Sequence, residues 1–216
     1  MSSTYKTVYR GGEATIEEKK SRFIAHISPV ADEKEAAEFI NGIKKKYWDA
    51  RHNCSAFIIG NNRNIMRSSD DGEPSGTAGK PMLEVLLGEN LTDVAAVVTR
   101  YFGGILLGTG GLIRAYTRAV KEALAECALI EKKQGIMVTL SGDYTLEGFL
   151  RRFIKDHGLP LMSCVYSEGV ELDTVIELSL VDDCIDEIIK NTDGRARIHK
   201  ADEISYALAD GEVILY

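Results

Sequence analysis

The 216-residue chain lacks several features that would place it in a special class of protein. Its longest unbroken apolar run falls far short of the roughly 18 residues that suggest a membrane-spanning helix. The first ten residues contain no apolar segment of the kind found in signal peptides. The four cysteines are far apart and form no C-x-x-C pair, which argues against a disulfide framework. We therefore expect a cytoplasmic protein with reduced thiols and no contact with a membrane.

Patterns that mark common enzyme sites are also missing. The chain contains no G-x-S-x-G nucleophile turn, no H-E-x-x-H zinc motif and no calcium-loop spacing. Its glycine-rich segment does not end in G-K-[ST], and Gly108-x-Gly110 lacks the third glycine of a dinucleotide-binding turn. We therefore expect no cofactor.

The charge is unevenly distributed along a chain of otherwise ordinary composition, with 44% apolar and 27% charged residues. Residues 1–133 contain 19 basic and 17 acidic side chains, whereas residues 134–216 contain 7 and 16. A second half with a net charge of −9 repels a phosphate backbone. Any nucleic-acid contact is therefore expected in the first half, and the acidic half could instead meet a basic protein partner.

Periodicity predicts an α+β protein of two domains, residues 1–133 and 134–216, joined by a linker at residues 131–135. The first domain is expected to contain strands at 4–10, 14–18, 22–29, 54–60 and 91–99, and helices at 31–48, 82–87 and 112–130. Tyr47 and Trp48 end the first helix, where we expect them to anchor the core. The second domain reads β-α-β-β-α-β, the ferredoxin-like order, with helices at 145–157 and 182–191.

The segment between Arg100 and Arg114 is the strongest candidate for a binding site. A buried strand ends there, five glycines follow within nine residues, and a long helix begins. Backbone N–H groups at a helix N-terminus attract anions, and flanking arginines can bind phosphate through two nitrogens. The predicted anion or nucleic-acid site consists of Arg100, Gly103, Gly104, Gly108, Thr109, Gly110, Gly111, Arg114 and Arg118, with Lys80 and Thr77 from the preceding loop. The alternative is that the glycines only allow close packing and that the basic helix face is simply solvated.

Two further clusters of residues suggest other kinds of site, a metal site and a nucleophilic pair. Asp70, Asp71 and Glu73 could hold Mg²⁺, although such a run is more often an acidic turn, and Thr77 could instead cap the helix that follows. His52 and Cys54 are two residues apart and would share a strand face, so they could form a nucleophilic pair. No third group orients them, which favours a structural role.

Two segments resemble the signatures of the Impact family, in its bacterial YigZ/YvyE-like branch. They are Gly88-Glu-Asn-Leu-Thr-Asp-Val-Ala-Ala-Val-Val-Thr-Arg-Tyr-Phe-Gly-Gly-Ile-Leu-Leu-Gly108 and Asp70-Asp-Gly-Glu-Pro-Ser-Gly-Thr-Ala-Gly-Lys-Pro81. The resemblance implies a first domain with the α/β fold of a small-subunit ribosomal protein and of domain IV of the translocating elongation factor. It implies a second domain similar to domain V of that factor.

For function, the resemblance implies a factor that binds RNA or the ribosome and modulates translation, with no catalytic residue to carry over. One alternative is a Mg²⁺-dependent enzyme acting on a phosphorylated small molecule, with Lys80 offsetting phosphate charge. Another is a protein-interaction adaptor that uses the acidic second domain.

Overall fold

The computed structural model describes residues 4–209 and 212–216, which form two sheets and five α-helices. The chain divides into two compact units, Tyr5–Ile130 and Glu131–Tyr216, with Thr4 grouped with the second. Each unit has its own hydrophobic core. Among the described residues, no helix is long and apolar enough to cross a membrane.

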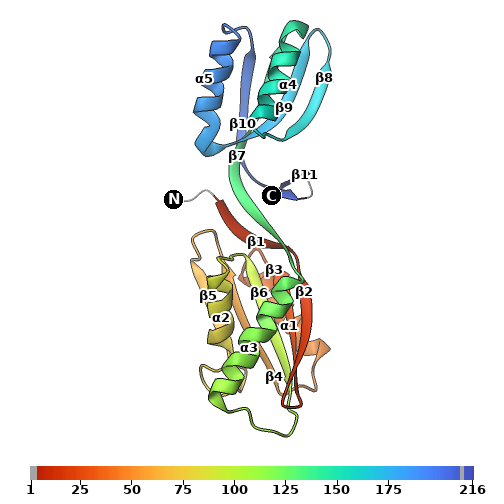
Figure 1. Cartoon of the computed structure of the whole chain (residues 1–216), viewed down its shortest axis with the longest axis vertical. Coiled ribbons are helices and arrows are strands. Elements are labelled where there is room, and N and C mark those ends of the chain that lie inside the picture. Colours follow the sequence, from red (N-terminus) through yellow and green to blue (C-terminus); the bar gives the residue numbers. More distant parts are fainter. Residues whose placement is uncertain (1–3, 210–211) are drawn as a thin grey trace. The chain divides into compact units, whose positions relative to one another are not determined.

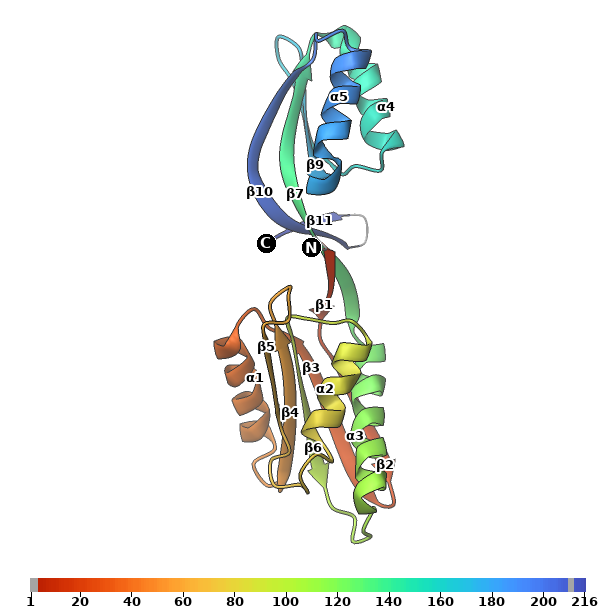
Figure 2. The ribbon, with the colours of Figure 1, turned by 90° about the vertical axis from the view of Figure 1, so that its left-hand side faces the viewer.

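A five-stranded antiparallel sheet forms the centre of the first unit, in the order β2-β3-β6-β4-β5 (Figures 1 and 2). Its strands are β2 (Gly12–Glu18), β3 (Ser21–Pro29), β4 (His52–Ile59), β5 (Ile65–Ser69) and β6 (Val94–Tyr101), and β1 (Thr4–Arg10) precedes them. The central strand β6 is buried along nearly its whole length because helices cover both faces of the sheet. This burial explains why its sequence is a continuous apolar run rather than an alternating one.

The three helices of the first unit cover the sheet unequally. Helices α2 (Gly79–Gly88) and α3 (Gly108–Ala125) pack on one face and form the main core, with Tyr116 and Met82 fully buried. Helix α1 (Glu33–Lys46) packs on the other face over a smaller cluster around Ala36. Figure 2 shows α1 on one side of the sheet and α2 and α3 on the other.

The second unit has the element order β-α-β-β-α-β, as expected, followed by one further strand. Its elements are β7 (Ala128–Gly142), α4 (Glu147–Asp156), β8 (Leu161–Tyr166), β9 (Val170–Glu177), α5 (Val181–Asn191), β10 (Arg197–Ala209) and β11 (Glu212–Leu215). The strands lie in the order β11-β10-β7-β9-β8 and are antiparallel. Both helices contribute to a single core with the sheet, through residues such as Leu150 and Ile188.

Several details differ from the sequence predictions. Residues 131–135 are not a loop: they lie within β7 and pair with β10, for example Lys132 with Ala207. Helix α3 begins at Gly108 and ends at Ala125, because Gly110 and Gly111 lie within its first turn and residues 128–130 already belong to β7. Strand β5 was not predicted. Trp48 does not anchor the core, since 82% of its surface is exposed just beyond the end of α1.

Candidate functional site

The N-terminus of α3 has no capping side chain. Leu107 occupies the N-cap position and has no polar side chain to accept a hydrogen bond from the first turn. The first turn, Gly108–Gly111, contains no acidic residue either. Its N–H groups therefore keep their donor capacity, and the helix dipole adds partial positive charge at this point.

A cleft of about 220 Å³ lies beside this helix start. It is lined by Glu18, Lys19, Leu107, Gly111, Arg114, Ala115 and Arg118. Arg114 and Arg118 of the predicted site lie together in this lining, and Lys19 joins them from the turn between β2 and β3. Arg118 lies 3.7 Å from Glu122, whereas Arg114 is exposed and forms no ion pair among the described residues. We call these three basic side chains and the first turn of α3 the cationic cleft.

Sequence reasoning missed Lys19 because its place in the cleft depends on a tertiary contact. Lys19 and Lys20 both have positive φ, 46° and 66°, in the tight turn that joins β2 to β3. That turn packs against the glycine segment: the Gly103 N–H donates to Ser21 Oγ at 3.2 Å. The only local signal is the pair Lys19-Lys20 at a hairpin turn. This pair does not indicate which helix the turn will contact.

The glycines between residues 103 and 111 differ in their structural roles. A Cβ at Gly103 would lie 2.0 Å from the Lys20 carbonyl carbon, so Gly103 allows backbone to approach backbone. Gly104 and Gly108 have φ of 84° and 70°, which side chains on L-residues rarely permit. Gly110 has open space around it, because a Cβ there would meet only Arg114 Nη1, at 3.5 Å. The packing alternative therefore accounts for Gly103, and backbone conformation accounts for Gly104 and Gly108.

Arg100 is not available to a ligand, which corrects its predicted role. Its side chain is 7% exposed, and the guanidinium donates from Nη1 to both carboxylate oxygens of Glu73, at 2.7 and 3.0 Å. Tyr116 donates to the same carboxylate at 2.8 Å. The two segments that resemble family signatures thus meet in a buried ion pair beneath the sheet face.

The acidic segment does not form a metal site. Asp71 accepts from Lys44 Nζ and from the Asn53 N–H, both at 2.7 Å, and Glu73 binds Arg100. Asp70 accepts from the N–H groups of Gly76, Ala78 and Gly79 at 2.8 to 3.0 Å. The three carboxylates therefore turn to three different partners, and the described residues contain no cluster of three or more metal-ligating side chains.

The remaining predicted residues of this loop also lie outside the cleft. Thr77 is buried and donates from Oγ1 to the Pro74 carbonyl at 2.7 Å, so it does not cap α2. Asp70 supplies the acceptors at the start of α2 in its place. The exposed Lys80 lies 4.0 Å from Glu84 on the next turn of the helix.

Asp70 should be worth about 1–2 kcal/mol to the first unit as the acceptor for the start of α2. Partial burial raises the pKa of Asp70, but the three backbone N–H donors outweigh it and hold the pKa below its usual value. This contribution is present above the unfolded-state pKa and is lost as the pH falls through the lower folded-state value. Urea unfolding of Asp70→Ala should show a deficit at pH 7 that narrows below about pH 4.

The matched control for this prediction is Asp186→Ala, which removes an exposed carboxylate from α5. It should change the free energy of unfolding by no more than about 0.5 kcal/mol. Equal stability of the two variants at pH 7 would show that Asp70 does not hold α2.

His52 and Cys54 do not form a catalytic pair. Burial raises the pKa of the Cys54 thiol to about 12, so its reactive thiolate form is disfavoured at neutral pH. The thiol donates to the Asp70 carbonyl at 3.0 Å, and His52 Nδ1 lies 2.9 Å from the Asp71 carbonyl. Both side chains therefore fix the acidic loop against β4.

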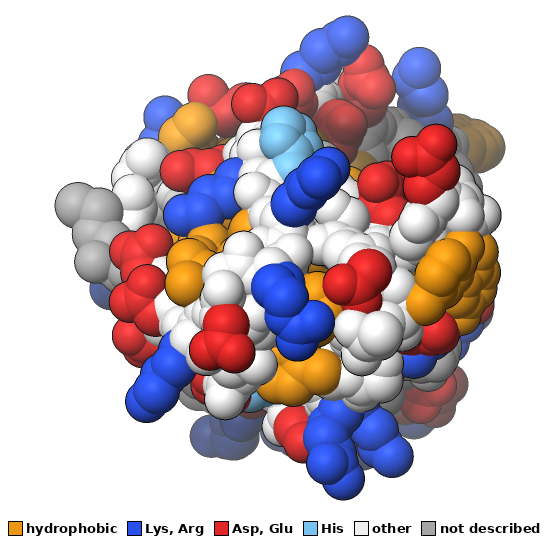
Figure 3. All heavy atoms as spheres, turned by 90° about the horizontal axis from the view of Figure 1, so that it is seen from above, with side chains coloured by type: hydrophobic (Ala, Val, Ile, Leu, Met, Phe, Trp, Pro, Cys, Tyr) orange, Lys and Arg blue, Asp and Glu red, His pale blue; other side chains and the backbone are white. Residues whose placement is uncertain are grey.

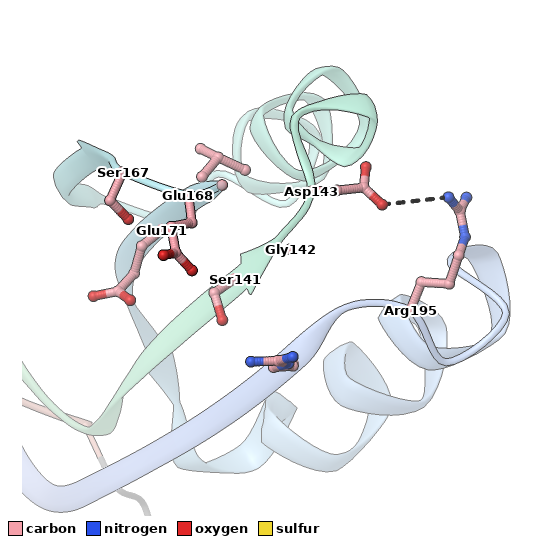
Figure 4. Close-up of a pocket in the computed structure, with 10 residues that line it drawn as sticks. Ser141, Gly142, Asp143, Ser167, Glu168, Glu171 and Arg195 are labelled. Atoms are coloured by element: carbon pink, nitrogen blue, oxygen red, sulfur yellow. Dashed lines mark ion pairs between the residues drawn. The ribbon is translucent and has the colours of Figure 1, made fainter.

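A larger and shallower cavity of about 550 Å³ lies in the second unit (Figure 4). It is lined by Ser141, Gly142, Asp143, Ser167, Glu168, Gly169, Val170, Glu171, Arg195 and Arg197. Arg195 lies 3.9 Å from Asp143, the ion pair drawn in the figure. Three acidic and two basic side chains line this cavity, whereas one acidic and three basic side chains line the cationic cleft, so this cavity has less preference for a phosphate.

The family model for the Impact N-terminal domain matches residues 19–124 of this chain. The chain is 47% identical over 206 residues to the Impact family member YvyE of Bacillus subtilis, which covers 95% of this chain and 94% of that protein. It is 43% identical over 128 residues to the Impact family member YigZ of Escherichia coli, covering 58% of this chain and 63% of the other. A crystal structure of a hypothetical protein matches 94% of this chain and 99% of its own, with 30% identity and a TM-score of 0.61.

Proposed function

The chain belongs to the Impact family, and from that premise we propose that it is a non-enzymatic RNA- or ribosome-binding factor that modulates translation. The observation that supports this proposal is the cationic cleft. It joins Lys19, Arg114 and Arg118 to an uncapped helix N-terminus. Cations and free N–H donors at one point are what a phosphate group requires.

The size of the cleft favours a phosphate of a polymer over a small cofactor. Pockets for drug-sized ligands usually enclose about 300–1,000 Å³, and this cleft encloses about 220 Å³. An RNA backbone needs only one phosphate in such a space, with the rest of the strand lying outside. The cleft also lies in the part of the chain that is not strongly acidic, as the charge distribution suggested.

The two units suit this proposal in different ways. The order β10-β7-β9-β8 with two helices on one core supports a ferredoxin-like second unit. We further propose that the first unit has the fold of a small-subunit ribosomal protein and of elongation-factor domain IV. We propose that the second unit is similar to domain V of that factor. A protein built from such units would bind the ribosome at the places where those domains bind.

The two alternatives are weakened to different degrees. A Mg²⁺-dependent enzyme would need carboxylates that face one site, and Asp70, Asp71 and Glu73 are each held by other groups. An adaptor would need a surface of one sign for a basic partner. On the face shown in Figure 3, acidic and basic side chains are interspersed. The adaptor is kept as an outcome of the test.

The test measures RNA affinity for Arg114→Glu, with ribosomal RNA fragments as the probe. Reversing this charge replaces attraction by repulsion, so affinity should fall about tenfold or more at low salt. The loss should shrink at high salt, because counter-ions screen both the attraction and the repulsion. A pull-down from lysate at two salt concentrations, with and without ribonuclease, would identify the partner.

Arg152→Glu is the control, since it makes the same charge change on the exposed surface of α4. If the two variants lose affinity equally, the effect is one of net charge and the cleft is not the binding site. If a protein partner survives ribonuclease and no RNA is recovered, the adaptor replaces this proposal.

A further inference from the structure

We propose that the cationic cleft takes single-stranded RNA and that the ring of Phe102 stacks on an unpaired base next to the bound phosphate. This inference rests on the proposed function and names the kind of RNA. Three features of the first unit carry it: an exposed ring with a fixed back, its position beside the cleft, and an apolar loop tip.

The ring of Phe102 is exposed and held in place. Its surface is 53% exposed directly after the end of β6. The guanidinium carbon of Arg100 lies over the ring at 5.6 Å, and over the buried ring of Phe23 at 5.4 Å. Because Glu73 fixes that guanidinium, Phe102 has a firm support on one side and solvent on the other. A ring held in this way loses little conformational freedom when a base stacks on it.

Phe102 is a neighbour of the phosphate site through the backbone. The next residue, Gly103, lies against the Lys20 carbonyl group and donates its N–H to Ser21 Oγ. Lys20 adjoins Lys19, which lines the cleft. The contact between Gly103 and Lys20 therefore joins the segment that carries the Phe102 ring to the turn that carries Lys19. We therefore expect the base of a nucleotide whose phosphate lies in the cleft to face this segment.

The loop beyond Phe102 is apolar at its tip. Leu106 is 83% exposed and Ile105 is 42% exposed, and the next residue along the chain, Leu107, lines the cleft. Apolar side chains next to a cationic cleft suit the faces of unpaired bases and a phosphate backbone together. A duplex hides its base faces in the stack and offers this surface only its phosphates. The combination favours a single strand.

The experiment compares a 12-nucleotide single-stranded RNA without self-complementarity with the same RNA annealed to its complement. Removing a stacked base contact by Phe102→Ala should weaken single-strand binding at least about fivefold and leave duplex binding within about twofold. Phe102→Leu should show the same pattern, because it keeps apolar bulk against Arg100 but has no ring. The thermal unfolding of each variant is measured alongside.

Tyr9→Ala is the matched control. Tyr9 is 47% exposed and precedes Gly12, which pairs with Ile27, whereas the cleft adjoins the opposite end of the hairpin, where Glu18 pairs with Ser21. This variant should bind both RNAs as the parent does.

The results distinguish failure of the stacking inference from failure of the proposed RNA-binding function. Single-strand binding by Phe102→Leu that equals the parent's, in a folded protein, overturns the stacking inference and leaves RNA binding intact. Equal affinity of the parent for strand and duplex also overturns it. Failure of the parent to bind either RNA at low salt overturns the proposed function and this inference with it.

Discussion

Glu73→Gln should lower the free energy of unfolding of the first unit by about 3–5 kcal/mol, because it leaves the buried Arg100 cation without its counter-charge. Arg100 is 7% exposed, and the Glu73 side chain is 3% exposed. Glutamine also offers one oxygen where the carboxylate accepts from Arg100 at two and from Tyr116. A loss of this size is a large fraction of the roughly 5–15 kcal/mol that stabilises a typical domain. Urea unfolding monitored by circular dichroism measures it.

Glu84→Gln is the control for this prediction. It removes an exposed carboxylate that lies 4.0 Å from Lys80 on α2, and such surface pairs contribute about 0.5 kcal/mol or less. The double variant Glu73→Leu/Arg100→Met should recover much of the stability lost in Glu73→Gln, because removing both charges also removes the cost of burying them. A deficit below about 1 kcal/mol for Glu73→Gln would contradict the assignment of this pair as a structural centre.

Gly103→Ala should destabilise the first unit by about 1–3 kcal/mol, the usual range for overpacking a tight contact. The added Cβ would lie 2.0 Å from the Lys20 carbonyl carbon and 2.4 Å from the Ser21 nitrogen. These are backbone atoms and cannot rotate away, so the turn between β2 and β3 has to move. Lys19 would move with that turn, and we expect RNA affinity to fall together with stability.

Gly110→Ala makes the same change in the same segment with the opposite expected outcome. Its Cβ meets only the flexible end of Arg114 at 3.5 Å, and its backbone is already helical. Alanine is a better helix former than glycine, so this variant should be as stable as the parent or slightly more stable. Melting temperatures of the two variants distinguish a packing contact from open space. If Gly103→Ala is as stable as Gly110→Ala, the close approach at Gly103 is not a constraint on the fold.

Local patterns predicted most of the regular elements. The strand at residues 4–10 was assigned correctly. The 3.6-residue apolar stripe of α3 was also correct, because it reports which side of that helix is buried. The boundaries of α3 were wrong at both ends. Glycines ordinarily indicate a loop, yet Gly108–Gly111 form the first helical turn, and the apolar residues 128–130 continued the helical pattern although they belong to β7. A strand as short as β5 has no periodic apolar pattern in its sequence. It forms because it pairs with β4.

The sequence by itself determined that this is an α+β chain in which a glycine-rich segment joins a buried strand to a long helix with basic side chains. These properties follow from the spacing of apolar residues and from the conformational freedom of glycine, which are local. Only the tertiary structure decided which of these charges are buried and which are exposed. Arg100 and Arg114 flank the same segment in the sequence, but β6 directs Arg100 inward to Glu73 while α3 leaves Arg114 at the surface beside Lys19. Arg100 and Glu73 are 27 residues apart, and they meet because the loop packs against the sheet. Once Arg100 is buried, it needs a counter-charge, and Glu73 supplies it.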